Sequence, residues 1–429
     1  MGIPTIPVRS HSAASHVALL LAACCFLVTA QTKSPTKTAR GVLYSSAGAE
    51  LSRYEIDADA AALTKKESIT LPAAVQYAWP HPSHKYLYIS WSNGGAASAS
   101  PGATAVPRGD RHGVNAYRIE RDGALTLIGK PVMLPARPIH NSVDASGTHL
   151  LLAYNEPSNL TIHKINTDGT IGAVVPQTAK IDAGIYAHQI RTDASGKTLI
   201  LVARGNGPGK NRPEDRGALK VFHYADGILG DEASIAPNGG ENFQPRHLDF
   251  HPTRPWVYVS LERQSKLQLY KLENGVLNAN PLFTKDSITD SSRRPQRQNA
   301  GTIHVHPNGK FLYQANRSAV PDGKGKTIDG GGENTIAVYS LDAKTGEPTR
   351  IQNIETHGAE PRTFALDPSA RLLVAGNQTA LLSSNSTSVP ASLAVYRVKA
   401  DGKLDYVRKY DVDTSKGNQF WTGIVELPQ

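Results

Sequence analysis

HLDFHPTRPWVYVSL (247–261) and LQLYKLENGVL (267–277) are the adjoining segments that indicate the fold. In the first, an apolar strand reaches a His-Pro turn and a second apolar strand follows. In the second, an alternating strand ends at an Asn-Gly turn and another short strand begins. Period-two alternation and tight turns of this chemistry are typical of antiparallel hairpins. Together the two segments predict a sheet of four short strands.

Both patterns recur along the chain. The first returns as AWPHPSHKYLYIS (78–90), NSVDASGTHLLLAY (141–154), QIRTDASGKTLILVA (189–203), IHVHPNGKFLYQA (303–315) and TFALDPSARLLVAG (363–376). The second occurs seven times, from LSRYEIDADAAAL (51–63) to LAVYRVKADGKL (393–404). Successive turns of the first pattern are 49 to 63 residues apart, and four-stranded units at this spacing are typical of propeller blades.

One blade lacks its first pattern, and the two ends of the repeat region can supply the strands of that pattern. The first pattern occurs six times, one fewer than the second, and FWTGIVEL (420–427) with RGVLYSS (40–46) can complete the seventh unit. Closure of this kind removes the open sheet edges of an all-β protein. The sequence therefore predicts an all-β, seven-bladed β-propeller over residues 40–429, with one blade closed by strands from both termini.

Residues 1–30 read as a signal peptide, followed by a short linker at 31–39. Arg9 precedes a thirteen-residue apolar run at 17–29, which is too short to span a bilayer, and Val28-Thr29-Ala30 resembles a cleavage signal. Leu21-Ala22-Ala23-Cys24 leaves a second interpretation open, a lipid anchor at Cys24. Either route predicts an exported protein, periplasmic or secreted, without a transmembrane span.

Charge and cysteine content limit the kinds of partner and of metal site that the chain can have. The net charge of +9 is not gathered into a basic stripe with interleaved aromatic residues, so we expect no nucleic-acid partner. A solvated basic surface explains most of the charge, and attraction of an anionic substrate explains the remainder. Cys24 and Cys25 are the only cysteines, which excludes disulfides and thiolate metal sites from the chain after the leader. We expect a monomer.

The long insertions all fall on links at one end of the blades. That end carries the link from the second to the third strand of each blade and the link to the next blade. The insertions are 93–112, 205–217, 285–299, 318–333 and 379–388. Because the turns at the other end stay tight, we expect one functional face.

Two rings of side chains are predicted at that face, one from the start of each inner strand and one from the end of each second strand. The first ring is Gln76, Ile139, His188, Arg246, Gly301 and Arg362. The second is Ser92, Asn155, Arg204, Glu262, Arg317 and Gln378. Polar strand ends are common, but four arginines, a histidine and a glutamate exceed what capping needs, so we expect a ligand site in the central channel.

The segment QPRHLDFHP (244–252) resembles the Gly-Pro-Arg-His-x-x-Phe-His-Pro segment of the seven-bladed propeller lactonases. That family includes propeller-type 6-phosphogluconolactonases and carboxymuconate-lactonizing enzymes, and the resemblance extends from about Gly41 to Val425. TIHVHPNGKFLYQANR and EPRTFALDP carry it further along the chain. The chain departs from the family at Gln244, where a glycine is usual, and at Gln189, where a serine is common. Its insertions are also longer than those of compact members. The identity of the substrate therefore stays open.

The resemblance implies a lactonase whose catalytic residues are His188, Arg246, Glu262 and Arg317. Hydrolysis of a lactone needs a base for the attacking water and positive donors for the developing oxyanion. His188 or Glu262 would be the base, and Arg246 and Arg317 would be the donors. The further candidates for substrate binding are Arg362, Arg204, His247, His304, Asn155, Gln378 and Gln76.

Structural roles compete with these functional ones. An arginine at a strand end is often a salt-bridge partner, and a glutamate beside Arg246 could simply neutralise it. Structural roles are favoured for His247, His251, His304 and His306, because His-Pro turns recur in blades outside the site. Of these, His304 lies on an inner strand and is the one kept as a possible ligand.

The rings predict an enzyme without a metal or other cofactor, because one carboxylate among four arginines would repel a hard cation. No Gly-x-Ser-x-Gly elbow is present. We expect hydrolysis of a small anionic or sugar lactone. Two alternatives remain open: a carboxymuconate-type lactonizing cyclase, in which Glu262 or His188 moves the proton, and an exported propeller that binds a ligand or protein without catalysis.

Overall fold

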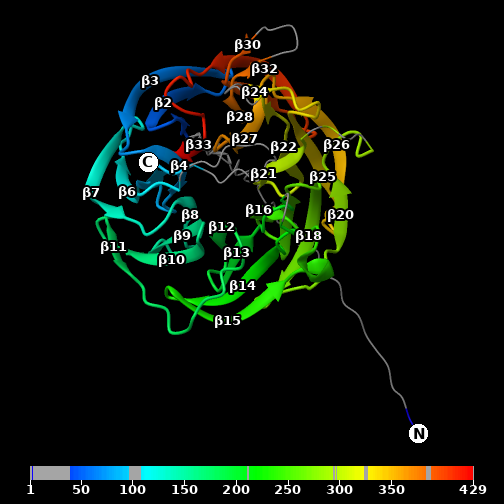
Figure 1. Ribbon diagram of the computed structural model, residues 1–429. Coiled ribbons are helices and arrows are strands. Elements are labelled where there is room, and N and C mark those ends of the chain that lie inside the picture. Colours follow the sequence, from blue (N-terminus) through cyan, green and yellow to red (C-terminus); the bar gives the residue numbers. More distant parts are fainter. Residues whose placement is uncertain are drawn as a thin grey trace. The chain divides into compact units, whose positions relative to one another are not determined.

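Seven sheets, six of four strands and one of five, form blades that surround one axis in a computed structural model of the protein (Figure 1). It describes Gly2 and residues 39–428, except 96–107, 210–211, 293–294, 296, 323–326 and 383–387. Apart from Gly2, the predicted signal peptide lies outside the described residues, together with Cys24 and most of the predicted linker. The chain from Ala39 onward forms one compact unit.

The blades follow one another along the chain, and each runs from an inner to an outer strand. The first four blades, inner strand first, are β33 (Thr422–Glu426), β1 (Gly41–Ala47), β2 (Glu50–Asp57) and β3 (Ala62–Thr70); β4 (Ala74–Pro80), β5 (Tyr86–Ser92), β6 (His112–Ile119) and β7 (Leu125–Met133); β8 (Pro138–Val143), β9 (His149–Asn155), β10 (Ser158–Ile165) and β11 (Ile171–Val174); and β12 (Ala187–Thr192), β13 (Thr198–Ala203), β14 (Ala218–Ala225) and β15 (Ile228–Ile235). A 3-10 turn, η1 (Pro237–Gly240), follows.

The last three blades repeat this order. They are β16 (Pro245–Phe250), β17 (Trp256–Leu261) and β18 (Lys266–Glu273) with the outer strands β19 (Val276–Leu277) and β20 (Phe283–Asp286); β21 (Asn299–Val305), β22 (Phe311–Arg317), β25 (Thr335–Leu341) and β26 (Pro348–Glu355); and β27 (Ala359–Leu366), β28 (Leu372–Thr379), β31 (Ser392–Val398) and β32 (Leu404–Asp411). The described residues contain no α-helix, and their 3-10 turn η1 is the sole helical element among them. No helix in this part of the chain is long and apolar enough to cross a membrane. The predicted all-β propeller of seven blades is confirmed.

Closure of the ring uses both ends of the propeller region, as predicted. β33 pairs antiparallel with β1, with Val42 opposite Val425 and Tyr44 opposite Gly423. In Figure 1 the red C-terminal strand β33 therefore lies in the ring of inner strands beside blue β1. The first and last strands of the propeller thus hold each other, and no inner strand is left unpaired at the point of closure.

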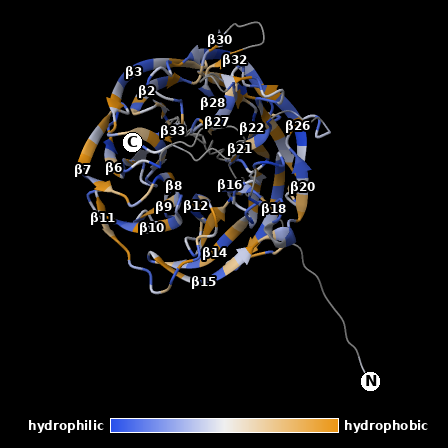
Figure 2. Ribbon diagram, in the orientation of Figure 1, coloured by the Kyte–Doolittle hydropathy of each residue, from blue (hydrophilic) through white to orange (hydrophobic). Residues whose placement is uncertain are grey.

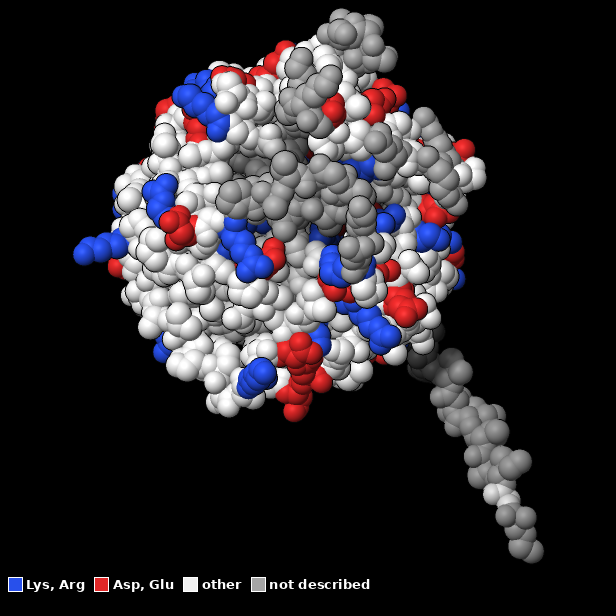
Figure 3. All heavy atoms as spheres, in the orientation of Figure 1, with Lys and Arg blue, Asp and Glu red and all other residues white. Residues whose placement is uncertain are grey.

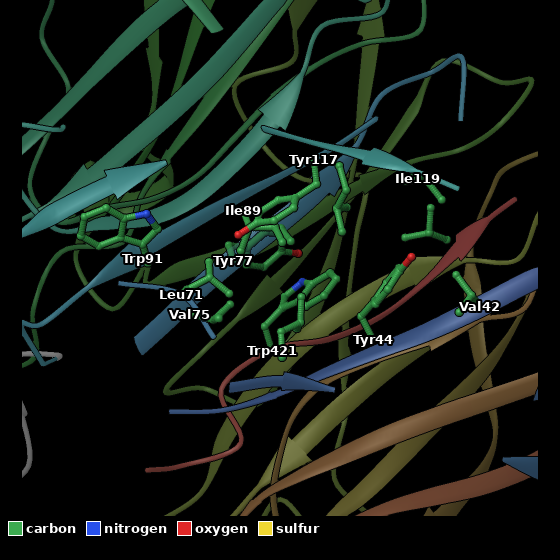
Figure 4. Close-up of a cluster of buried hydrophobic side chains, with 14 of the residues drawn as sticks. Val42, Tyr44, Leu71, Val75, Tyr77, Ile89, Trp91, Tyr117, Ile119 and Trp421 are labelled. Atoms are coloured by element: carbon green, nitrogen blue, oxygen red, sulfur yellow. The ribbon is translucent and has the colours of Figure 1, made fainter. Parts of the chain in front are cut away.

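Apolar side chains fill the spaces between neighbouring blades. Period-two alternation turns one face of each strand to the blade on either side, and Figure 2 shows apolar and polar residues alternating along the blades. Seven buried clusters result, one for each blade interface. The cluster in Figure 4 joins Tyr44, Trp421 and Val75, from the closing blade and its neighbour.

A tyrosine hydrogen bond recurs between neighbouring blades. The hydroxyl groups of Tyr88, Tyr258 and Tyr313 each donate, over 2.9 Å, to the carbonyl oxygen of a glycine in an outer turn of the following blade. These glycines have φ of +73° to +84°, a conformation that few other residues adopt without strain. The repeated glycine turns of the sequence therefore connect blades as well as strands.

The insertions after β22 and β28 meet in an additional small sheet. It consists of β23 (Val320–Pro321), β24 (Thr327–Ile328), β29 (Leu381–Leu382) and β30 (Ser388–Val389). Ile328 of β24 pairs parallel with Leu382 of β29. Two insertions from neighbouring blades therefore lie at the same end of the propeller, as the strand order requires.

Candidate functional site

A β-bulge interrupts six of the seven inner strands at the same level. On β16, Pro245 is opposite Leu261 but His247 is opposite Ser260, which leaves Arg246 as the extra residue. Equivalent register shifts occur on the other five strands, and the bulged residues are Gln76, Ile139, His188, Arg246, the pair Gly301–Thr302 and Arg362. These are the residues of the first predicted ring. A bulge re-aims a side chain and ends regular pairing, which suits a site at a strand end.

The carboxylate of Glu262 lies among three arginines. Arg317 Nη2 is 2.5 Å from Glu262 Oε1, Arg204 Nη1 is 2.8 Å from Oε2, and Arg246 Nε is 3.4 Å from Oε1. Arg246 is only 1% exposed and Glu262 6% exposed. Because Glu262 follows β17 directly, its place at the strand end brings it to the level of the bulges.

These arginines decide the charge state of Glu262. Burial opposes ionisation, but Arg204, Arg246 and Arg317 outweigh it and lower the pKa of the carboxyl group well below its usual range. For Arg246 the balance is the reverse, since burial and the neighbouring Arg317 lower its pKa to about 9. Glu262 is thus an ionised anchor for the guanidinium groups.

His188 adjoins the same group. Its Nε2 is 3.4 Å from Arg246 Nη1, and its Nδ1 is buried without a hydrogen-bond partner among the described residues. Burial, followed by the charge of Arg246, lowers the pKa of the His188 imidazole well below its usual 6.5. The ring is therefore neutral at pH 7 and can accept a proton.

Glu360 and Arg297 enlarge this group. Glu360 Oε2 is 3.3 Å from Arg317 Nη1, and Glu360 Oε1 is 3.5 Å from Arg297 Nη1. Tyr186 adjoins on the other side, with the guanidinium carbon of Arg204 3.9 Å from its ring centroid. Sequence reasoning missed all three residues.

Tyr186 and Glu360 share an unusual backbone conformation. Each stands two residues before a bulged residue, His188 or Arg362, and has a positive φ, +59° for Tyr186 and +55° for Glu360. Strain of this kind in a residue other than glycine is typical of functional sites.

Arg362 and Arg137 both lie near the ring of Phe420. The guanidinium carbon of Arg362 is 3.6 Å from the ring centroid and that of Arg137 is 5.5 Å away. Phe420 precedes β33, the inner strand on which no register shift occurs, so an aromatic ring stands where the other blades supply bulged residues. We call the whole group the axial cluster: Arg137, Arg204, Arg246, Arg297, Arg317, Arg362, Glu262, Glu360, His188, Tyr186 and Phe420.

Below the axial cluster, three aromatic rings cross the axis. The ring centroid of His247 is 5.2 Å from that of His188 and 6.1 Å from that of His140, which is 4.1 Å from Tyr77. Burial lowers the pKa values of His140 and His247, so both rings are neutral. His247 thus contacts His188 rather than the arginines around Glu262.

His304 lies in a different group on the axis. Its Nδ1 is 3.6 Å from Asp249 Oδ2, and Arg191 Nη1 is 2.8 Å from Asp249 Oδ1. Asp249 stands three residues beyond Arg246 on β16, about 10 Å further along the strand. The structure therefore does not bring His304 to Glu262. We call Arg191, Asp249 and His304 the lower cluster.

Three candidates remain, and they form no hydrogen bond or ion pair with the arginines of the axial cluster within the described residues. The amide of Gln76 donates to the carbonyl oxygen of Ala74, and its Oε1 is buried without a partner among the described residues. Asn155 is buried at the end of β9. Gln378 accepts a bond from the amide nitrogen of Gln419 through its backbone carbonyl. They line the same level of the propeller without joining the charged group.

Proline is the signal in the sequence that could have located the bulges. It precedes three of the bulged residues, at Pro138, Pro245 and Pro361. Proline cannot donate to a ladder and therefore favours strand starts and bulges. Arg137, one residue before Pro138, could have been found in the same way.

Charge gathers inside the propeller rather than on the face drawn in Figure 3. There, Lys and Arg side chains are scattered among Asp and Glu side chains, and most of the described surface belongs to other residues. The axial cluster, by contrast, holds six guanidinium groups and two carboxylates. Such a group fits an anionic ligand. No set of three or more His, Cys, Asp or Glu side chains suited to a metal occurs in the described part of the chain.

Comparison with known proteins identifies relatives of this architecture. The model of a family described as a seven-bladed β-propeller lactonase matches residues 34–389. A 6-phosphogluconolactonase of Bacillus subtilis (strain 168) is 28% identical over 286 residues, which are 62% of this chain and 70% of the relative. One of Serratia proteamaculans (strain 568) is 25% identical over 370 residues, 86% of this chain and 93% of the relative.

A solved structure, the periplasmic gluconolactonase of Pseudomonas aeruginosa, superimposes with a TM-score of 0.67 at 20% identity. The superposition covers 90% of this chain and 99% of that one, and at this identity it supports the fold alone. The family match, by contrast, spans most of the chain and confirms the resemblance of PRHLDFHP and its companion segments. The chain belongs to the seven-bladed β-propeller lactonase family.

Proposed function

We propose that the axial cluster hydrolyses a small sugar or carboxylate lactone without a metal ion. The observation that carries this proposal is a single arrangement: a neutral histidine beside Arg246, and three arginines around one ionised carboxylate. Ester hydrolysis needs a base and an oxyanion site at one place. The relatives named 6-phosphogluconolactonase support the choice of a sugar lactone.

His188 is the base in this proposal, and Glu262 is not. A carboxylate engaged by three arginines has too low a pKa to accept a proton readily near pH 7. The imidazole of His188 is neutral, and its Nε2 makes only a long, weak contact of 3.4 Å with Arg246 Nη1, so this nitrogen can accept the proton of the attacking water. Glu262 instead holds Arg246 and Arg317 in place.

The reaction then proceeds in two steps. Water attacks the lactone carbonyl carbon and gives a proton to His188, while Arg246 and Arg317 stabilise the oxyanion. The ring C–O bond breaks next, and His188 returns the proton to the leaving alkoxide. The neighbouring Arg246 disfavours imidazolium, so the return of the proton is fast. The product is an open-chain hydroxy acid.

The charge balance supports catalysis without a metal. Six guanidinium groups around two carboxylates repel a divalent cation, and they supply the positive charge that a metal would otherwise bring. We also propose export of the protein, on the strength of the leader-like sequence at 1–30.

A panel of lactones tests the proposal. The full chain is incubated with neutral and anionic sugar lactones in a pH-stat, with EDTA present and spontaneous hydrolysis subtracted. We expect turnover that EDTA leaves unchanged and that Arg246→Gln lowers. Saturable binding without turnover would favour the non-catalytic propeller. Ring closure of an added unsaturated diacid, followed by ultraviolet absorbance, would favour the lactonizing cyclase.

A further inference from the structure

The arginines of the axial cluster fall into two groups. Arg204, Arg246, Arg297 and Arg317 each lie within 3.5 Å of a carboxylate oxygen of Glu262 or Glu360. Arg137 and Arg362 have no carboxylate partner among the described residues. Two positive charges therefore lie on the axis with no carboxylate within ion-pair distance in the part of the chain that the structure describes.

Both cations approach the ring of Phe420. Arg362 stacks on its ring at 3.6 Å, and Arg137 approaches the same ring at 5.5 Å. Arg137 comes from the residue before β8 and Phe420 from the segment before β33, so the contact joins two non-adjacent blades. The face of an aromatic ring attracts cations, but it is too weak a partner to replace a carboxylate.

Arg137 is buried and Arg362 is partly buried, so holding both charges without a carboxylate partner is costly. Arg137 is 4% exposed, and its Nε and Nη1 have no hydrogen-bond partner among the described residues. Burial lowers the pKa of Arg137 to about 10. Burial and the charges of Arg246, Arg317 and Arg137 together lower the pKa of Arg362. Charged groups held at such a cost are typical of binding sites, where a ligand supplies the missing charge.

We propose that Arg137, Arg362 and Phe420 form a subsite for an anionic group of the substrate, a phosphate or carboxylate carried by the lactone. This inference rests on the proposed function and deepens it. Guanidinium groups bind the oxygens of either anion in a bidentate way. The ring of Phe420 orients both guanidinium groups and offers an apolar surface to the carbon skeleton.

With this subsite, the arginines of the axial cluster have two different roles. Arg246 and Arg317, held by Glu262, face the reacting carbonyl group, and Arg137 and Arg362 hold the far end of the same molecule. Arg137 and Arg362 are therefore positioned to decide between charged and neutral lactones. Their loss affects KM for anionic lactones more than kcat.

Steady-state kinetics with matched lactones test this assignment. One lactone is neutral, and its counterparts carry a phosphate or a carboxylate. In Arg137→Gln and Arg362→Gln we expect KM for the anionic lactones to rise about tenfold to a hundredfold, because each variant removes a charge-assisted hydrogen bond. We expect KM for the neutral lactone to change by less than about threefold.

Arg191→Gln is the matched control. Arg191 also stacks on aromatic rings of the axis, at 4.9 Å from Trp79 and 5.5 Å from Phe250, but Asp249 already neutralises it. We expect this variant to leave the ratio of the two KM values unchanged. An equal loss for neutral and anionic lactones in Arg137→Gln would overturn the subsite.

Calorimetric titration of the full chain with inorganic phosphate and with malonate separates the subsite from the proposed function. We expect both anions, or one of them, to bind the wild type at least about tenfold more tightly than Arg137→Gln. If that difference appears but no lactone is hydrolysed, the subsite stands and the proposed function fails. Turnover of lactones without anion binding, or equal binding by both proteins, would overturn the subsite alone.

Discussion

Glu262 and Asp249 are carboxylates of one blade, the first buried and the second partly buried, and the cations around them differ in number. Three arginines contact Glu262, and the axial cluster to which it belongs has six guanidinium groups for two carboxylates. Asp249 has one arginine and the half-buried His304. The backbone amides of Phe250 and Val305 also donate to Asp249, over 3.0 and 2.8 Å.

The difference separates a structural ion pair from a binding site. Arg191 and His304 outweigh the burial of Asp249 and lower the pKa of its carboxyl group to about 2, so the lower cluster is balanced by its own residues. The axial cluster is not balanced in this way. A protein retains a surplus of buried positive charge at a cost, and an anionic substrate explains that cost.

The two histidines of these clusters allow the sharpest comparison. In His188→Gln we expect kcat to fall about a hundredfold to ten-thousandfold, because the general base is lost. In His304→Gln, beside Asp249, we expect kcat to stay within about threefold of the wild type. Lactone hydrolysis followed in a pH-stat measures both. Equal losses in the two variants would remove the distinction between the clusters.

The arginines provide the next comparison. Arg246→Gln removes one donor for the oxyanion, and a single such donor is worth about a hundredfold to a thousandfold in kcat. Arg191→Gln removes a partly buried arginine that is paired with Asp249 rather than with Glu262, so kcat should change little. If Arg246→Gln raised only KM, the oxyanion role would be wrong.

The pH profile gives a smaller effect of definite sign. A base is active when neutral, and burial and Arg246 hold the pKa of His188 well below 6.5. An unperturbed histidine would lose about tenfold in rate at about pH 5.5, whereas here we expect a loss of less than about twofold in kcat/KM. An acid limb with an apparent pKa near 6.5 would contradict the assignment of His188.

Stability should respond in opposite directions at the two clusters. Asp249→Asn leaves Arg191 without its partner, and we expect the free energy of unfolding to fall by about 3 kcal/mol. Arg137→Gln removes a cation that has no carboxylate partner among the described residues, and we expect the free energy of unfolding to rise by about 1 kcal/mol. Urea unfolding in a buffer free of multivalent anions measures both changes. A loss of stability in Arg137→Gln would show that this residue holds the fold together.

Repetition made the fold predictable from sequence. The seven Asp-Gly-like turns and the six His-Pro or Asp turns determine strand number and spacing, and the shortage of one inner strand predicts closure by FWTGIVEL. The ring residues were located by the same spacing. For Arg246, Glu262 and Arg317, position in the repeat was enough to predict neighbours in space.

The site residues that the sequence did not predict either precede the repeated strands or depend on an irregular backbone conformation. Arg137 and Phe420 stand before their inner strands, where the chain follows no common pattern and reaches across the axis. The positions of the Tyr186 and Glu360 side chains depend on left-handed backbone conformations. Such a conformation cannot be predicted from the sequence where the residue is not a glycine. His304 was kept as a candidate because an inner strand alone does not tell which level of the axis a side chain occupies.

The central claim is that charge imbalance marks the reacting centre, and paired substitution of the two carboxylates tests it most directly. kcat for an anionic lactone is measured for Glu262→Gln and Asp249→Asn, with folding of each variant checked by circular dichroism. We predict a loss of at least about a hundredfold in Glu262→Gln, whose arginines lose their anchor, and less than about threefold in Asp249→Asn. A folded Glu262→Gln protein with wild-type kcat would contradict the account.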